Sequence, residues 1–507
     1  MASGSRIRRF ALPSLATASI GRAFVPAAGL FMVLYYGAIM TVGRTWPYHL
    51  LFQPVDRGLT FNSMLEHLLA GRFDVDPGII TDEGFIEGGK VYSYFGIGPA
   101  LLRLFLIPFG ELHNLDITRL SCILGAATAG LFKVLAVLQV YRQCAPTKLS
   151  TGLFWALVLS IVLGGAQVTY LVPTIYQEPD AWGQALSAMF VYCAVRGLIV
   201  DHAFSQSLLL QMALVAGAAL LTRVSYGVGL YAAFGLLVLT VAIGANVEKT
   251  TLGLLQTLCS RRFLVPMAAS IVLAGVCGGV NYARWGSALT FADWHHYKYF
   301  FVQPERMVRF VKYGDFNPVR IPYALMYYFL PIWAIIRPDG RFMFDEFRQR
   351  YIDGNDLPPS SFFISDPLLV LLDIVFVVLW WRGRMQRDQF DGRASIALLV
   401  GLAAAPFLVL NAMDMAFRYR MEFYPVIELA AFLGMYAACT TSGPRTQSLL
   451  RNAAWPCAIT GIVAAHLLVL TYSVSPVSMD FVGAVAKPDG IGHVGWVRFY
   501  LQRIDKK

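Results

Sequence analysis

The chain has 507 residues, of which 57% are hydrophobic and only 14% are charged, and its mean hydropathy is +0.57. This composition excludes a soluble globular protein and is typical of a polytopic membrane protein. The formal net charge of +10 does not indicate binding to nucleic acid, because the basic residues lie mainly in short segments between apolar runs.

The N-terminal segment is basic and precedes a long apolar run. Residues 1–23 carry several arginines, and the run from Phe24 to Val42 is too long for the apolar core of a cleaved signal peptide. We therefore expect residues 1–23 to be a cytoplasmic segment and the run to be an uncleaved first membrane span.

Apolar runs of about 17 to 25 residues recur along the chain, each long enough to cross a hydrocarbon core of roughly 30 Å. We predict eleven spans, which give an all-α polytopic membrane domain over residues 24–475. They are Phe24 to Val42, Ile117 to Tyr141, Thr151 to Pro173, Asp180 to Val200, Ser207 to Thr222, Tyr226 to Gly244, Phe263 to Asn281, Pro367 to Trp381, Ser395 to Leu410, Tyr424 to Thr440 and Pro456 to Tyr472. Two further runs, Gly96 to Phe109 and Ile321 to Ile336, are ambiguous, and thirteen spans result if both cross.

The distribution of Lys and Arg favours the count of eleven. If neither ambiguous run crosses, the most basic loops all fall on the side of the N-terminus, as the positive-inside rule requires. The outer side then receives the acidic first loop (44–109), the turn 176–180, the aromatic and basic loop (284–366), the loop 411–423 and a C-terminal tail (476–507).

The first outer loop holds seven carboxylates and one helical pattern. The carboxylates are Asp56, Glu66, Asp74, Asp76, Asp82, Glu83 and Glu87. Apolar residues between Phe61 and Leu69 follow helical spacing, with Thr60 as the expected N-cap and Gly71 as the expected stop. We expect this amphipathic helix to lie in the membrane interface, with Asp56 at its entrance.

Several short motifs on the predicted outer side together resemble a known superfamily. They are Asp56 with the helix that ends at Ala70-Gly71, the aromatic return from Tyr92 to Leu104, the turn Tyr176 to Asp180, the segment Asn281 to Gly286, and Arg418-Tyr419-Arg420 before Pro425. In this order, they resemble GT-C membrane glycosyltransferases, such as bacterial protein mannosyltransferases and lipid A aminoarabinose transferases. The resemblance is patchy but is spread over most of the chain.

The resemblance implies a polyprenyl-phosphate sugar donor and a catalytic aspartate just after the first span. Asp56 matches that position and is our candidate general base. Relatives often carry Asp-Glu there, whereas Arg57 follows Asp56 here and the pair Asp82-Glu83 lies further on. The base is therefore either Asp56 or one of that pair.

The other expected roles follow from the charge that must be stabilised. Arg418 and Arg420, with Tyr419 between them, are the candidate ligands of the donor phosphate, because a planar guanidinium can bind two oxygens. Glu178, with Asp180 as second choice, corresponds to an acid that positions the acceptor or holds a divalent ion in relatives. A divalent metal ion is possible but optional, since a monophosphate leaving group needs less neutralisation than a nucleotide diphosphate.

Further aromatic and histidine residues are weaker candidates for substrate binding. They are Tyr92, Tyr94, His295 and His296, which lie in the outer loops. Adjacent histidines among aromatic residues more often mark an interfacial or substrate-binding surface than a metal site. The seven cysteines show no CxxC spacing, so neither a disulfide framework nor a zinc site is predicted.

The sequence thus predicts a membrane glycosyltransferase that transfers a sugar, with inversion, from a polyprenyl-phosphate donor to an envelope glycan, lipid or protein. We expect a multi-pass protein of a bacterial inner membrane, with its site facing the periplasm, membrane lipids around it and no nucleic-acid partner. The alternative is a transporter or lipid flippase, which would be expected to carry ionisable or broken helices at mid-depth and two related halves. We see no repeat, and most charges lie outside the spans.

Overall fold

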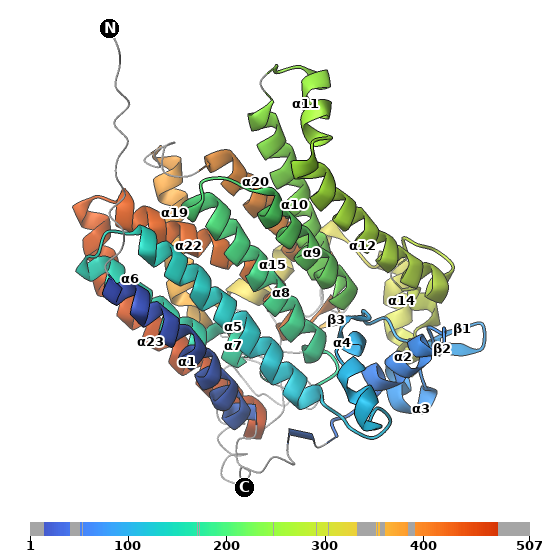
Figure 1. Ribbon diagram of the computed structural model, residues 1–507. Helices are drawn as coiled ribbons and strands as arrows, with labels where there is room; N and C mark the ends of the chain where they lie inside the picture. The colour runs from blue at the N-terminus through green and yellow to red at the C-terminus, as the bar shows by residue number, and fades with distance from the viewer. Residues whose placement is uncertain are drawn as a thin grey trace.

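The computed structural model describes residues 15–40, 51–52, 54–169, 171, 173–246, 248–290, 292–302, 304–331, 351, 353–354, 360–383 and 391–474. Within these residues the chain is almost entirely helical, and its long helices run side by side in one bundle (Figure 1). The predicted all-α membrane fold is confirmed. The predicted tail 476–507 and the start of the first loop, 44–50, lie outside the described residues.

The elements follow one another along the chain in the order listed here. They are α1 (Leu15–Met40), α2 (Thr60–Leu69), α3 (Pro77–Ile80), η2 (Thr81–Glu83), β1 (Phe85–Glu87), β2 (Lys90–Tyr92), α4 (Gly98–Leu101), η3 (Leu104–Phe109), α5 (Thr118–Gln143), α6 (Lys148–Leu163), α7 (Gly165–Thr169), α8 (Gln177–Val195), η4 (Arg196–Val200), α9 (Gln206–Thr222), α10 (Val224–Ala245), α11 (Thr251–Leu258), α12 (Arg261–Trp285), η5 (Trp294–His296), α13 (Lys298–Val302), α14 (Pro304–Tyr313), η6 (Pro318–Arg320), α15 (Ile321–Phe329), β3 (Asp353–Gly354), α18 (Phe362–Ser365), α19 (Pro367–Trp381), α20 (Gly392–Leu402), α21 (Ala404–Asn411), β4 (Asp414–Met415), η7 (Phe417–Phe423), α22 (Tyr424–Thr440) and α23 (Pro444–Val474).

Nine helices in the described part of the chain are long and apolar enough to cross a membrane. The predicted spans at α9 and α19 correspond to helices of 17 and 15 residues, which fall below that length, so the count of eleven is not confirmed. The ambiguous run 96–109 is divided between α4 and η3, which are too short to cross. The run 321–336 begins with the nine-residue α15, and its last five residues lie outside the described ranges.

The polar segments of the chain meet at one end of the bundle, which we call the loop end. It comprises residues 54–116, 173–180, 221–226, 284–290, 292–302, 304–331 and 411–424. The C-terminal end of α12 reaches the first loop there, because Arg284 Nη1 donates to the Phe95 carbonyl at 2.8 Å. The end of α9 comes equally close: a Cβ on Gly96 would lie 2.2 Å from the Leu221 carbonyl oxygen, so only glycine fits this approach.

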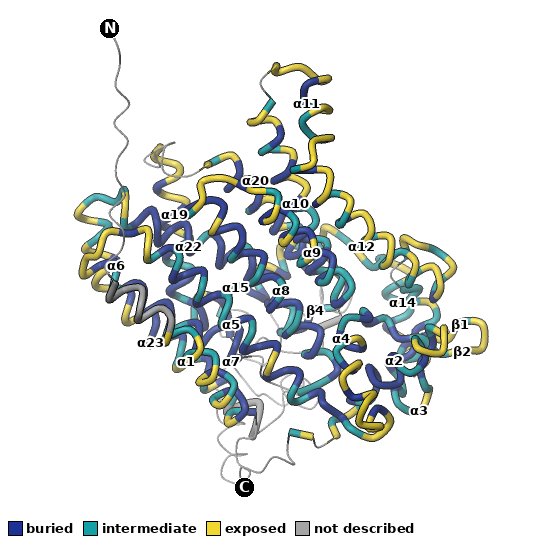
Figure 2. Tube along the Cα trace, in the orientation of Figure 1, coloured by how far each residue is buried: buried dark blue, intermediate teal, exposed yellow. Residues whose placement is uncertain are grey.

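The helix of the first loop is confirmed, but its predicted placement is wrong. Phe61, Met64 and Leu65 on α2 are at most 1% exposed and pack against other residues of the same loop, including Val75 and Ile80, in a small core of their own. Figure 2 shows α2 largely buried beside α3 and α4. Its apolar face is covered by protein and not by the membrane interface, because the rest of the loop folds over it.

The caps of α2 also differ from the prediction. Leu59 precedes the helix, while the Thr60 hydroxyl donates to the Arg57 carbonyl at 2.7 Å instead of capping an N–H group. Gly71 follows Ala70 with φ +70°, a left-handed conformation that favours glycine. The expected stop is therefore confirmed, one residue beyond the C-cap.

Charged side chains are also buried inside the bundle, which the sequence did not predict. Lys133 on α5 lies 2.5 Å from Glu428 on α22, and the two side chains are 1% and 4% exposed. Lys133 also donates to Gln184 on α8 at 3.0 Å. This contact joins three helices through one ammonium group, and each charge has its partner within the protein.

Loss of one partner of this pair tests how far the bundle depends on it. Lys133→Met leaves Glu428 buried and unpaired, so we expect a loss of about 3–5 kcal/mol in unfolding free energy. Thermal unfolding in detergent measures it. The double variant Lys133→Met/Glu428→Leu removes both charges and should recover most of the loss; a double variant as unstable as the single one would contradict the pairing.

Candidate active site at the loop end

The first loop is fastened to the bundle by a buried ion pair. Arg103 binds both oxygens of Glu178, at 2.5 and 2.8 Å, and both side chains are fully buried. The same guanidinium donates to Asn62 Oδ1 at 3.0 Å and to the Pro99 carbonyl at 2.8 Å. Because a two-pronged Arg–carboxylate contact is strongly directional, this pair fixes how the loop sits on α8.

Glu178 was the first choice for positioning the acceptor or holding a divalent ion. In the structure, both of its oxygens are used by Arg103 and neither is open to a ligand. This geometry gives Glu178 a structural role and favours Asp180 for the predicted one.

Asp180 belongs to a cluster of one arginine between two acids. Arg223 Nε lies 2.8 Å from Asp180 Oδ1, and Arg223 Nη2 lies 2.8 Å from Glu422 Oε1. Ser225 also donates to Glu422 at 2.9 Å. Both carboxylates are fully buried, whereas the Arg223 side chain is 18% exposed. Within the described residues, Asp180 Oδ2 and Glu422 Oε2 accept no hydrogen bond, so each retains an oxygen able to take a donor or a cation.

A second arginine joins this cluster through an aromatic ring. The guanidinium carbons of Arg223 and Arg418 lie 5.4 and 5.0 Å from the centre of the Tyr419 ring. Arg418 also lies over Tyr176, at 4.6 Å. Arg418 and Tyr419 are both half-buried, as expected for groups at the edge of a site. Two cations are thus held beside one ring, which suits an anionic group such as a phosphate.

Arg420, which was predicted to bind phosphate together with Arg418, does not share this position. It is fully buried, donates to Ser365 Oγ at 2.6 Å and lies 3.4 Å from Asp366 Oδ2. The reason is local: residues Phe417–Phe423 form a 3₁₀-helix, in which side chains two residues apart point in different directions. Arg418 therefore reaches the loop end while Arg420 points into the bundle.

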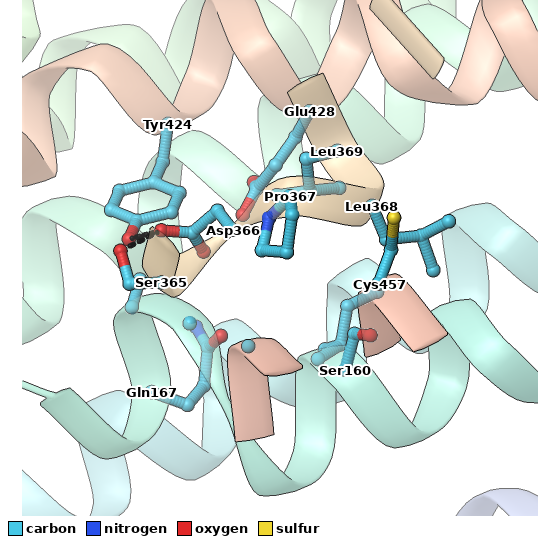
Figure 3. Close-up of a pocket in the computed structure, with 14 residues that line it drawn as sticks. Ser160, Gln167, Ser365, Asp366, Pro367, Leu368, Leu369, Tyr424, Glu428 and Cys457 are labelled. Carbon is cyan, nitrogen blue, oxygen red and sulfur yellow. Dashed lines mark hydrogen bonds between the residues drawn. The ribbon is translucent and has the colours of Figure 1, made fainter. Parts of the chain in front are cut away.

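The interior partner of Arg420 lines a small cavity (Figure 3). Asp366 accepts hydrogen bonds from Ser365 at 2.7 Å and from Tyr424 at 2.8 Å. Glu428 and Gln167 line the same cavity, whose volume of about 20 Å³ is enough for a single water molecule. This polar interior supports the framework, and its charges are compensated by Arg420 and by the lysine on α5.

Glu83 lies in a buried box of tyrosines. Its carboxylate accepts hydrogen bonds from Tyr297 at 2.6 Å, from Tyr94 at 3.4 Å and from Tyr176. Burial, together with the charge of Glu83, raises the pKa of the Tyr176 and Tyr297 phenols well above the ordinary value, so they stay protonated as donors. As the alternative base to Asp82, Glu83 is less accessible, because both of its oxygens already accept hydrogen bonds from phenols and its side chain is buried.

The two remaining candidate bases lie on either side of Arg57. Arg57 Nη1 is 2.8 Å from Asp56, and Nη2 is 2.5 Å from Asp82. The Asp56 side chain is 79% exposed, against 33% for Asp82. Burial alone would raise the pKa of Asp82, but the hydrogen bond from Thr81 and the charge of Arg57 outweigh it and lower that pKa. Asp56 is thus the most open carboxylate of the three.

The weaker candidates lie at the rim. Tyr92 is half-buried on β2, and Tyr94 is part of the tyrosine box. His295 contacts Asp293 at 2.8 Å, and His296 contacts Glu87. Among the residues that the structure describes, no three His, Cys, Asp or Glu side chains gather as they would around a metal ion.

Several residues of the site were missed from the sequence. Arg57, Tyr176 and Tyr297 fall in segments that were predicted to face outward, but no pattern distinguished them from their neighbours. Arg223 did have a signal, because it interrupts two apolar runs at a predicted outer turn, where a cation is not favoured without a function. Glu422 lies four residues after the first arginine of the Arg-Tyr-Arg motif, and the sequence assigned it no role.

Comparisons with known proteins give structural similarity but no sequence family. No family model matches the chain, and no curated protein sequence is similar to it. The apo oligosaccharyltransferase of Archaeoglobus fulgidus is similar in structure, with 12% identity and a TM-score of 0.46 over 92% of this chain and 60% of that one. ArnT from Cupriavidus metallidurans, bound to undecaprenyl phosphate, has 16% identity and a TM-score of 0.43 over 96% of this chain and 72% of that one.

Both matched enzymes are GT-C glycosyltransferases, the superfamily that the sequence resembles. This chain spans about 60% of the length of the oligosaccharyltransferase. Identities and TM-scores this low do not place the chain in the family of either enzyme, so its function must be inferred from its own residues.

The ion pair of Arg103 and Glu178 gives a prediction about the site as a whole. Glu178→Ala leaves the buried guanidinium without its partner, so we expect a loss of about 3–5 kcal/mol in unfolding free energy. Limited proteolysis of the first loop should become faster in the same variant. Glu66→Ala, which removes a partly exposed carboxylate of the same loop, is the control; equal effects of the two changes would argue against the pair as the fastening point.

The raised pKa values of the tyrosines around Glu83 predict that the protein loses stability at alkaline pH. Free tyrosine titrates near pH 10. Since the folded-state pKa values of Tyr176 and Tyr297 lie above that, their contribution to stability is complete below about pH 10 and is lost as the pH rises further. Thermal unfolding at a series of alkaline pH values should show a shallower loss for Tyr176→Phe/Tyr297→Phe than for the wild type. Tyr192→Phe should leave the slope unchanged.

Proposed function

We propose that the chain is a membrane glycosyltransferase that moves a sugar, with inversion, from a polyprenyl-phosphate donor to an envelope glycan, lipid or protein acceptor. The observation that supports it most is that two partly exposed arginines at the loop end, Arg223 and Arg418, lie beside the ring of Tyr419. Tyr176, which lies under Arg418, also feels the charge of Arg57, the ion-pair partner of the open carboxylate of Asp56. The two arginines are suitable partners for an anion, and the carboxylate of Asp56 is a suitable partner for a substrate hydroxyl.

The reaction assigns one role to each group. The acceptor oxygen attacks the anomeric carbon, the bond from that carbon to the phosphate oxygen breaks, and the hydroxyl proton passes to Asp56. The polyprenyl phosphate leaves with the bonding electron pair, and Arg418 and Arg223 stabilise its charge. Because attack and departure occur on opposite faces of the sugar, the configuration inverts.

A divalent ion is compatible with this scheme but not required by it. The free oxygens of Asp180 and Glu422 would hold such an ion, since hard cations prefer carboxylate oxygens. The ion would add neutralising charge beside Arg223. Glu178 is not needed for it.

The orientation in the membrane follows from charge. The end of the bundle opposite the loop end carries basic residues at the termini and connections of its helices, among them Arg142, Lys148, Arg196, Arg261 and Arg393. The positive-inside rule puts that end in the cytoplasm. The loop end then faces the periplasm of a bacterial inner membrane, where a lipid-linked sugar and an envelope acceptor can meet.

The transporter or flippase alternative is supported by one observation. Lys133, Glu428 and Asp373 lie inside the bundle, which departs from the expectation that few charges occur within spans. Lys133 and Glu428 are paired and almost completely buried, however, and the cavity beside them has room only for about one water molecule. They fit a structural contact better than a path for a solute.

The test is transfer of radiolabelled sugar from candidate polyprenyl-phosphate donors in membranes that contain the protein. Asp56→Asn should lower the transfer rate about 10²- to 10⁴-fold. Asp201→Asn, at the opposite end of the bundle, is the matched control and should transfer normally. Normal transfer by Asp56→Asn would remove Asp56 as the base, and Asp82→Asn would be measured next. If the wild type transfers nothing from any donor but moves a solute, the enzyme proposal fails.

A further inference from the structure

Within the described part of the chain, no arginine or lysine forms an ion pair with one buried carboxylate at the loop end. Glu83 is 7% exposed, and its partners are three phenol groups from distant segments: Tyr94 of the first loop, Tyr176 before α8 and Tyr297 after η5. A buried carboxylate without hydrogen bonds would be costly, whereas three phenol donors compensate it. These hydrogen bonds therefore connect segments that are far apart in the sequence.

The box leaves Glu83 poorly suited to take a proton from a substrate. Oε1 accepts from Tyr176, and Oε2 accepts from both Tyr297 and Tyr94. A substrate hydroxyl would have to displace these phenols and enter a buried space. By contrast, Asp56 on the far side of Arg57 is open to solvent.

Two of the three phenols belong to parts of the site that need a fixed position. The Tyr176 ring lies under Arg418, with the guanidinium carbon 4.6 Å from the ring centre. Its hydroxyl is tied to Glu83, so the side chain cannot swing away from this position without breaking that hydrogen bond. Tyr297 stacks on Phe85, with ring centres 4.8 Å apart, and so joins the segment after η5 to β1.

We propose that Glu83 is a positioning residue, which orients Arg418 toward the donor phosphate through the ring of Tyr176. The negative charge at the phenol end of the ring also increases the electron density of its face, which strengthens the contact with the guanidinium. Tyr297 and Tyr94 hold Glu83 itself in place. This inference rests on the proposed function for the identity of the anion, but the geometry of the box does not depend on it.

The first experiment tests the box without any substrate. Thermal unfolding in detergent is measured for Glu83→Gln, Tyr297→Phe and the double variant. If the two groups form one contact, the fall in Tm of the double variant is clearly smaller than the sum of the two single falls. Strictly additive falls, here and for the pair Glu83→Gln and Tyr176→Phe, would overturn the proposal.

The second experiment separates positioning from catalysis. Tyr176→Phe keeps the ring but removes the bond to Glu83, so the KM for the donor should rise about tenfold with kcat nearly unchanged. Glu83→Gln keeps an acceptor oxygen and should behave in the same way, whereas Glu83→Ala should raise the KM further. Asp56→Asn should do the opposite and lower kcat. Tyr192→Phe, a tyrosine near the other end of α8, is the control and should leave both constants unchanged.

The pH profile distinguishes the two roles of a carboxylate. If Glu83 were the base, Glu83→Gln would abolish kcat and the acidic limb of its pH dependence, and Tyr176→Phe would leave the KM unchanged. That result would overturn the inference. Coupled Tm values in a protein that transfers no sugar would instead keep the box and reject the proposed function, so the two failures are distinguishable.

Discussion

The arrangement of the loop end depends on one contact, the buried pair of Arg103 and Glu178. Arg103 is the point where the first loop returns to the bundle, and Glu178 is in the first turn of α8, two residues before Asp180. The bond therefore fixes the distance between the loop that carries the open carboxylates and the helix that carries a buried one. Since both charges lie away from water, removing either one leaves the other unpaired at a cost of about 3–5 kcal/mol, and this cost opposes release of the loop.

Aromatic rings link the charges of the site that are not paired directly. Arg223 is bound by Asp180 and Glu422, and both it and Arg418 contact the ring of Tyr419. Tyr176 contacts Arg418 through its ring and Glu83 through its hydroxyl. A cation held over a ring remains attractive to an anion. The tyrosines thus connect the arginines to the buried carboxylate of the first loop.

The sequence predicted the fold better than the site. Apolar runs locate most of the spans because length and hydropathy alone decide membrane insertion, and only α9 and α19 fall short of the expected length. Arg418 and Asp180 could be selected as candidates, since charges beside spans are rare enough to stand out, and the structure places both at the loop end. That Arg420 points elsewhere could not be predicted, because the direction of a side chain depends on the local helix type, which a motif does not reveal. Arg103 and Glu83 required knowledge of which distant segments meet, and no local pattern carries that information.

The pair of Lys133 and Glu428 also has a consequence for assembly in the membrane. α5 is synthesised long before α22, so Lys133 is made before its partner Glu428. Until then, an unpaired ammonium group in the middle of a helix costs about 2.5–3.5 kcal/mol on insertion scales. The early helices therefore cannot settle into their final packing alone, and the late half of the chain completes the bundle by supplying the missing charge. The order of synthesis makes α22 the helix that completes this buried pair.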